Sequence, residues 1–274
     1  MNRAQSKTQS RETAQENISI IQNGQYTIKG NIITIPTIQT EFIPAQAILL
    51  PSPAPVVPLD GKIFITDRPA LLAAEEYRND VAILNFASAK NPGGGFKNGS
   101  MAQEESLCYG SLLYSSLTEP NAEEYYKINR ESPHGGIYNS NAVWSGGVPV
   151  IRDSDAKLIN FWLCDIITLP AVNKGHATKT VDNNRINDEM RLRCARAIEI
   201  ARMKNVRNFI LGAYGCGVFK NDAEDVSGFF YDLLIVQGLR FHFKNIIFAI
   251  KGVRYNFDCF NRRFENFLSS SKEN

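Results

Sequence analysis

The chain has 274 residues, 43% of them hydrophobic and 21% charged, which is ordinary for a globular protein of one or two domains. Its net charge of +2 excludes a strongly basic surface, so we expect no direct nucleic-acid readout. No apolar run reaches the roughly 18 residues that span a bilayer. The polar segment 1–17 lacks the apolar core of a secretion signal, which predicts a cytoplasmic protein without membrane contact.

Cysteines and histidines give no sign of a metal site. The five cysteines are far apart and form no Cys-x-x-Cys pair, and the three histidines are scattered. This pattern predicts reduced thiols, no disulfide framework and no zinc site. We therefore expect neither a metal nor another cofactor.

The first 60 residues predict an accessory region ahead of a larger domain at 61–274. Residues 3–22 have a helical pattern that Gly24 would end, and Tyr26–Ile35 alternates around Gly30-Asn31 as a hairpin does. Prolines are then frequent through residues 36–60, which predicts a rigid, extended linker.

From Gly61 onward strands and helices alternate. Strands are predicted at 63–66, 81–86, 164–169, 209–213 and 246–250, and helices at 69–78, 101–116, 185–203, 222–236 and 256–269. Residues 118–160 are poorly periodic and predict a long loop of functional importance. The alternation predicts an α/β fold whose sheet is covered by helices on both faces.

A triple glycine, Gly93–Gly95, follows the predicted strand at 81–86. Its bare backbone allows a ligand to approach where any Cβ would collide. After a spacer of seven residues, 96–102, come Gln103, Glu104 and Glu105. A backbone cradle beside two carboxylates suits a sugar-phosphate ligand whose bond needs a proton to break.

A second glycine loop, Gly212–Phe219, follows the strand predicted at 209–213 and precedes Asp222, a candidate helix cap. Strand, glycine turn and helix start together predict an anion site. The spacing fits neither a dinucleotide-binding motif nor a P-loop, and a tight turn without a ligand is the alternative. Adjacent parallel strands would bring both glycine loops to one edge of the sheet.

The acidic pair also has a purely structural interpretation. Ser100 and Gln103 have the spacing of a capping box, and glutamates are favoured in the first turn of any helix. On residue chemistry alone capping is the stronger interpretation. Neighbouring helical residues are about 100° apart around the axis, so Glu104 and Glu105 cannot do the same job.

The segment Asn-Phe-Ala-Ser-Ala-Lys-Asn-Pro-Gly-Gly-Gly-Phe at 85–96, followed by Gln-Glu-Glu, resembles the bacterial-type poly(ADP-ribose) glycohydrolases of the macrodomain superfamily. Gly212–Phe219 is similar to the diphosphate loop of that family. The resemblance implies a three-layer α/β/α macrodomain-like fold with a mixed central sheet and an N-terminal helix-hairpin extension. The 130–148 region looks longer and richer in glycine than the family pattern.

The resemblance also implies roles for individual residues. Glu105 matches the catalytic glutamate, and Glu104 matches the residue that holds the scissile ribose. The implied substrate-binding residues are Gly93, Gly94, Gly95, Gln103, Gly215, Cys216, Gly217, Val218 and Phe219. Phe219 would pack on the distal ribose, with ordinary core packing as its alternative.

Together these features predict a monomeric glycoside hydrolase that releases ADP-ribose from poly(ADP-ribose), with Glu105 as general acid and base. Its partner would be the ADP-ribose polymer or an ADP-ribosylated protein. The alternatives are hydrolysis of mono-ADP-ribose linkages on protein or nucleic acid, and a non-catalytic ADP-ribose-binding macrodomain. The intact Gln-Glu-Glu triplet argues against the non-catalytic alternative.

Overall fold

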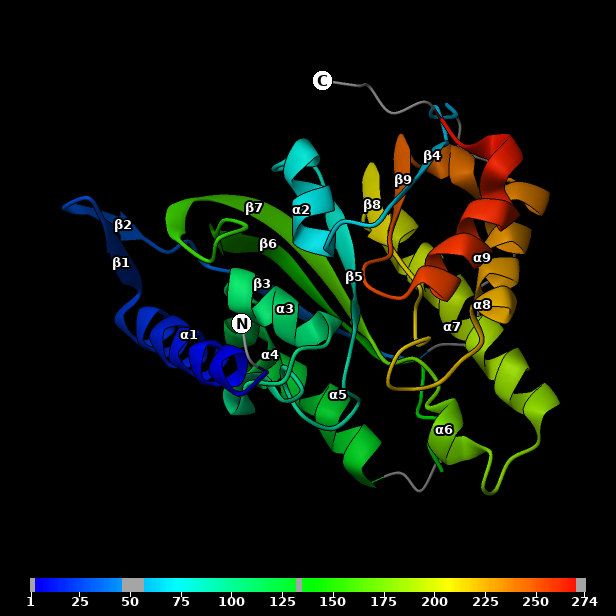
Figure 1. The fold of residues 1–274 in the computed structure, drawn as a ribbon, viewed down its shortest axis with the longest axis horizontal. Coiled ribbons are helices and arrows are strands. Elements are labelled where there is room, and N and C mark those ends of the chain that lie inside the picture. The colour runs from blue at the N-terminus through cyan, green and yellow to red at the C-terminus, as the bar shows by residue number, and fades with distance from the viewer. Residues whose placement is uncertain (1–2, 46–56, 132–134, 270–274) are drawn as a thin grey trace.

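A computed structural model describes residues 3–45, 57–131 and 135–269, and its centre is a seven-stranded mixed sheet (Figure 1). In spatial order the strands are β3 (Gln39–Ile43), β6 (Ala142–Arg152), β7 (Leu158–Leu169), β5 (Ala82–Phe86), β8 (Asn208–Leu211), β9 (Asn245–Ala249) and β4 (Lys62–Thr66). From β7 to β4 neighbouring strands run parallel, whereas β6 is antiparallel to both its neighbours. The predicted α/β fold with a mixed sheet is confirmed.

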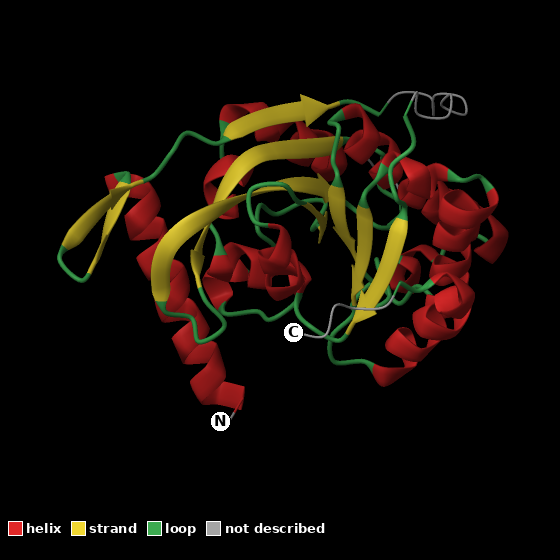
Figure 2. Ribbon diagram, turned by 90° about the horizontal axis from the view of Figure 1, so that it is seen from above, coloured by secondary structure: helices red, strands yellow, loops and turns green. Residues whose placement is uncertain are grey.

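Helices cover both faces of the sheet, and the strands lie between the two helical layers in Figure 2. One layer holds α7 (Asn183–Met203), α8 (Ala223–Tyr231) and α9 (Arg254–Phe264), and the other holds α2 (Ala70–Ala74), α3 (Gln103–Gly110), α4 (Leu113–Leu117) and α5 (Pro120–Glu131). Alternate residues of one strand enter opposite cores: Leu84 packs with α7 and α8, and Ile83 with α3 and α5. A short helix, α6 (Lys174–Ala177), follows β7.

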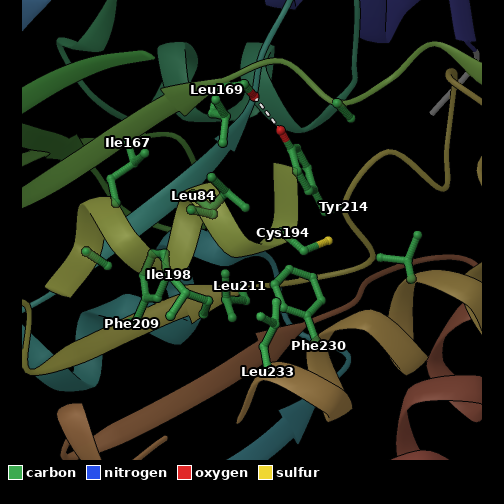
Figure 3. Packing of buried hydrophobic residues seen from close by; sticks show 14 of the residues in the cluster. Leu84, Ile167, Leu169, Cys194, Ile198, Phe209, Leu211, Tyr214, Phe230 and Leu233 are labelled. Atoms are coloured by element: carbon green, nitrogen blue, oxygen red, sulfur yellow. Dashed lines mark hydrogen bonds between the residues drawn. The ribbon is translucent and has the colours of Figure 1, made fainter. Parts of the chain in front are cut away.

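The larger core lies between the sheet and the layer of α7, α8 and α9. Leu84, Phe209 and Leu211 meet Cys194 and Phe230 there, all of them at most 2% exposed (Figure 3). Each such side chain contributes roughly 1.5–3 kcal/mol by leaving water. This core holds β5 and β8 in place, and both strands lead into the glycine loops.

The N-terminal helix and hairpin are present as predicted. Helix α1 (Arg3–Asn23) ends at Gly24, which has a φ of +68°. The hairpin of β1 (Gln25–Ile28) and β2 (Asn31–Thr34) turns at Lys29 and Gly30 rather than at Gly30-Asn31. Both turn residues have positive φ, as a two-residue hairpin loop requires.

The predicted linker at 36–60 is wrong for residues 39–43. These residues form β3, which pairs with β6 at the edge of the main sheet. Residues 46–56 of the predicted linker lie outside the described part of the chain. The domain boundary at residue 60 stays a prediction. Among the described helices, none has the length and apolar character needed to cross a bilayer.

The long loop predicted at 118–160 is also wrong. This stretch contains α5, all of β6 and the first residues of β7. Strand β6 is buried on both faces, so it has no alternating pattern to detect. Its register shifts between Ser145 and Val148, at the Gly146-Gly147 pair that suggested a loop.

Smaller differences concern the ends of helices. The helix predicted at 101–116 is two helices, α3 and α4, because Ser111 leaves the helix to form a bridge with Val150 of β6. The helix predicted at 222–236 continues from α8 into a π-helix at Asp232–Val236. The helix predicted at 69–78 consists of α2 and a 3-10 turn at Glu75–Tyr77.

Candidate active site

Both glycine loops lie at the carboxyl edge of the sheet, as predicted. Strands β5 and β8 are parallel neighbours there. The ring of Phe86, the last residue of β5, comes so near Gly212 that a Cβ on this glycine would be 2.9 Å from Phe86 Cζ. A Cβ on Gly215 would be 2.8 Å from Ala171 Cβ, in the segment after β7. Three strand ends therefore converge on one site.

The first glycine loop closes over the two carboxyl groups. Gly94 has a φ of +57°, and a Cβ at this position would be 2.6 Å from Glu105 Oε1 and 3.0 Å from Glu104 Oε2. A Cβ on Gly95 would be 2.2 Å from Ser100 Oγ. Any side chain at Gly94 would therefore displace both carboxyl groups.

Glu105 is held by two backbone amides and is 7% exposed. Its Oε1 accepts from the Gly95 amide at 2.8 Å, and its Oε2 accepts from the Ala102 amide at 3.1 Å. Ala102 is the N-cap of α3, so Glu105 caps the helix from its third position. One carboxyl group thus joins the helix start to the triple glycine.

The predicted capping box of Ser100 and Gln103 is wrong, because α3 begins at Gln103 itself. The Gln103 side chain turns to β5 instead. Its Oε1 accepts from the Phe86 amide at 2.9 Å, and its Nε2 donates to the Leu84 carbonyl at 2.8 Å. Gln103 therefore fixes the start of α3 against the end of β5, which sets the position of the two glutamates that follow.

Glu104 is more deeply buried, at 3% exposed, and has different partners. Its Oε2 accepts from the Ser88 amide at 2.7 Å and its Oε1 from Asn85 Nδ2 at 3.4 Å. Burial raises the pKa of Glu104 to about 8, with a smaller contribution from the charge of Glu105, although the Ser88 amide and Asn85 oppose the rise. The protonated form of Glu104, which can donate a hydrogen bond, is therefore more favoured than in an exposed glutamate.

Asn85 and Ser88 were missed as site residues. Asn85 is fully buried in β5 and also donates to Thr168 Oγ1 at 3.1 Å. One signal in the sequence could have revealed it: Asn85 is a single amide in the apolar strand segment 81–86. Ser88 acts through its backbone amide, which no residue pattern reveals.

The second glycine loop is fixed at its base by hydrogen bonds and exposed at its tip. Asn221 Nδ2 donates to the carbonyls of Val172 and Gly215, at 2.7 and 3.0 Å. At the tip Gly217 is exposed and Val218 is 77% exposed. Asp222 caps α8, as predicted, by accepting from the Glu224 amide at 2.9 Å.

The amides of this loop differ in their availability. The Cys216 amide donates to the Ala213 carbonyl at 3.1 Å within the turn. Within the described part of the chain, no carbonyl accepts from the amides of Gly215, Gly217 or Val218. Burial raises the pKa of the Cys216 thiol, which disfavours a nucleophilic thiolate. Among described residues, no three His, Cys, Asp or Glu side chains are grouped to hold a metal ion.

Phe219 closes the second loop and has two kinds of contact. Its carbonyl accepts from the Gly175 amide at 3.1 Å, and its partly buried side chain packs against the larger core. Its ring also meets that of Tyr138, with centroids 6.1 Å apart and planes at 43°. Phe219 therefore does pack against the core, but it is only partly buried there.

A comparison with known protein families matches residues 14–153 to the microbial-type PARG catalytic domain, where PARG denotes poly(ADP-ribose) glycohydrolase. This match includes the first glycine loop and both glutamates. Among curated protein sequences none matches the chain.

Solved structures of that family resemble the whole fold. The poly(ADP-ribose) glycohydrolase of Thermomonospora curvata is 29% identical, with a TM-score of 0.83 over 94% of this chain and 100% of its own. With the inhibitor ADP-HPD bound, the same enzyme has a TM-score of 0.79 at the same identity and coverage. The Deinococcus radiodurans enzyme in complex with ADP-ribose is 36% identical, with a TM-score of 0.70 over 75% of this chain and 84% of its own.

Proposed function

Because this chain belongs to the microbial-type poly(ADP-ribose) glycohydrolases, we propose that it hydrolyses the ribose–ribose O-glycosidic bond of poly(ADP-ribose) with Glu105 as general acid and base. One observation carries this assignment: Glu105 and Glu104 approach the same bare glycine, Gly94, at the carboxyl edge of the sheet. A ribose seated on Gly94 would meet both carboxyl groups.

Binding of the substrate would use backbone amides on both sides of these carboxyl groups. The triple glycine Gly93–Gly95 would line the scissile ribose. The amides of Gly215, Gly217 and Val218 would donate to the diphosphate, since no described carbonyl accepts from them. The Cys216 amide serves the turn itself, so we assign it no role in phosphate binding.

The two glutamates would then divide the chemistry. Protonated Glu105 donates its proton to the leaving ribose oxygen as the anomeric carbon becomes oxocarbenium-like, and the ionised carboxylate then takes a proton from the attacking water. Positioned acid–base catalysis of this kind contributes typically ~10²–10⁴-fold. Glu104, whose protonated form is favoured by burial, would donate a hydrogen bond to a ribose hydroxyl and hold the sugar in place.

The test is incubation of poly(ADP-ribose)-modified protein with the parent enzyme and with Glu105→Gln, measuring released ADP-ribose. We expect Glu105→Gln to bind ADP-ribose within about threefold of the parent yet to lose at least about 10²-fold in turnover, because it removes the proton donor and keeps the side-chain volume. The amide oxygen can still accept from one of the two backbone amides that hold Glu105. Glu124→Gln, on the exposed side of α5, is the matched control and should retain full activity.

Turnover by Glu105→Gln at the parental rate would refute the assignment of Glu105. The same assay on mono-ADP-ribosylated protein separates the two hydrolase alternatives. The proposal requires the polymer to be cleaved faster than the mono-modified substrate.

A further inference from the structure

Tyr138 has an unusual backbone conformation for a residue of its type. Its φ is +57°, and it is the one aromatic residue among the described non-glycine residues with positive φ. In this region the Cβ of an L-residue crowds the backbone, so glycine and asparagine are preferred. Such strain persists only where the surroundings hold it, and it is concentrated at functional sites.

A buried arginine holds the strained segment. Arg193 of α7 is 1% exposed. Its guanidinium donates to the Tyr138 carbonyl at 2.9 Å, to the Ile137 carbonyl at 3.2 Å and to Ser140 Oγ at 2.9 Å. Burying a guanidinium is costly unless its donors find acceptors. These three hydrogen bonds all go to residues 137–140, and they fix the backbone of Tyr138.

Arg193 also lies on the apolar face of its helix. It is three residues after Met190 and four before Ala197, and both of these are buried in the larger core. A charged side chain on that face has no solvent to reach. Its burial is explained by its hydrogen bonds to residues 137–140 and by its ion pair with Glu189 at 3.8 Å.

The side chain of Tyr138 lies beside the candidate active site. Its ring meets the ring of Phe219 at the end of the second glycine loop. The next residue, Asn139, donates from its amide to Asn129 Oδ1 at 3.3 Å, and Asn129 Nδ2 donates to the Tyr125 carbonyl at 2.9 Å. The Tyr125 hydroxyl donates to the Ser88 carbonyl at 3.2 Å, next to the amide that binds Glu104. Tyr138 therefore lies at the second loop, and hydrogen bonds of Asn129 connect its segment to Tyr125 of α5.

We propose that Tyr138 is a specificity-determining residue, whose ring joins that of Phe219 in one aromatic surface against the distal ribose of ADP-ribose, and that Arg193 is its positioning residue. This inference rests on the proposed function and on the role that the family resemblance implies for Phe219, which is to pack on that ribose. Tyr138 is only partly buried, so the residue is in part accessible from solvent. Aromatic rings pack well on the C–H face of a sugar and lose little conformational freedom.

The experiment compares two ligands by calorimetry: ADP-ribose and ADP, which lacks the distal ribose. Tyr138→Gly should weaken ADP-ribose binding roughly 3- to 10-fold, the value of one aromatic contact, and leave ADP binding within about twofold. Tyr138→Phe keeps the ring and should bind both ligands as the parent does. Phe241→Ala, at the partly exposed Phe241 on the opposite edge of the sheet, is the control for loss of an aromatic ring elsewhere.

Thermal unfolding separates this role from a structural one. Glycine adopts a φ of +57° freely, so Tyr138→Gly should not lower the melting temperature. If Tyr138→Gly left the ratio of the ADP-ribose and ADP affinities unchanged, the proposal would be overturned. Failure of the proposed function has another signature, because the parent would then release no ADP-ribose from the polymer.

The positioning role of Arg193 is tested with Arg193→Met, which keeps the apolar stem and removes the hydrogen bonds. It should reproduce the selective loss of ADP-ribose affinity and, unlike Tyr138→Gly, lower the melting temperature. In the double variant the selective loss should not exceed that of Tyr138→Gly alone. If the losses of ADP-ribose affinity in the two single variants were additive in the double variant, Arg193 would not act through Tyr138. If Arg193→Met does not fold, Arg193→Lys replaces it in the same comparison.

Discussion

The two glycine loops occupy the same edge of one sheet but are built in opposite ways. In the first loop, a Cβ on Gly94 or Gly95 would collide with a neighbouring side chain at less than 3 Å. In the second, Gly212 and Gly215 at the base are tightly enclosed, but a Cβ on Gly217 at the tip would meet nothing within 4 Å. The first loop packs tightly around two carboxyl groups, whereas the second is fixed at its base and exposed at its tip.

The difference follows from the work each loop would do. Proton transfer tolerates little displacement of the donor, so the first loop surrounds Glu105 with amides and packed atoms. A diphosphate needs amides that point outward, and these can lie on an exposed tip provided that its base is fixed. Rigidity is concentrated where the bond would break.

The largest effect is expected from Gly94→Ala. The new Cβ would be 2.6 Å from Glu105 Oε1, at a φ that alanine adopts poorly, so the carboxyl group must move. A displacement of about 1 Å can cost ~10²-fold in rate, and we expect a loss of kcat of at least that size. Gly217→Ala on the open tip should cost less than about threefold, since it keeps the amide. Similar losses in the two variants would contradict the proposed contrast.

An intermediate effect is expected from Glu104→Gln on stability. Because burial raises the pKa of Glu104 to about 8, the folded protein holds a proton that the unfolded chain loses above its ordinary pKa of 4.5. The parent should therefore lose stability as the pH rises from about 5 to about 8, and Glu104→Gln should not have this loss.

The relative gain of Glu104→Gln should be small at pH 5 and rise towards pH 8 by roughly 1 kcal/mol per pH unit, measured by denaturant unfolding. Glu119→Gln, at an exposed position before α5, is the control and should show no such dependence. A gain that is independent of pH would show that Glu104 is ionised in the folded protein.

The smallest effect is expected at the base of the second loop. Asn221→Ala removes the hydrogen bonds to the carbonyls of Val172 and Gly215. We expect ADP-ribose affinity to fall roughly 5- to 10-fold, equivalent to about 1 kcal/mol, because the loop amides are no longer held in place. Asn121→Ala, which removes an exposed hydrogen bond to Thr40, should change nothing measurable by calorimetry. Unchanged affinity in Asn221→Ala would show that the loop is held by other contacts.

Elements with a local signature were predicted well. Helix α7 has an apolar face and an N-cap at Asp182, and α1 ends at its glycine. Strands β5, β8 and β9 are short apolar runs between turns, as buried parallel strands are. The errors at β3 and β6 concern strands that exist because they pair with each other, far apart in the sequence.

The candidate site also has a part that the sequence revealed and a part that it did not. The glycine loops and the Gln-Glu-Glu triplet were visible as motifs, because each is a short run of residues close together in the chain. The partners of the triplet were not visible. Gln103 binds β5 instead of capping a helix, and Glu104 meets Asn85 from a different element.

The sequence by itself determined the strand–loop–helix units, the two glycine loops and the acidic pair, because each depends on residues close together in the chain. Only the tertiary structure decided that Glu105 faces Gly94, that Glu104 is buried beside Asn85, and that Tyr138 meets Phe219. These contacts join elements from different parts of the fold. Their geometry is set by the packing of the sheet and its helices, which no local pattern records.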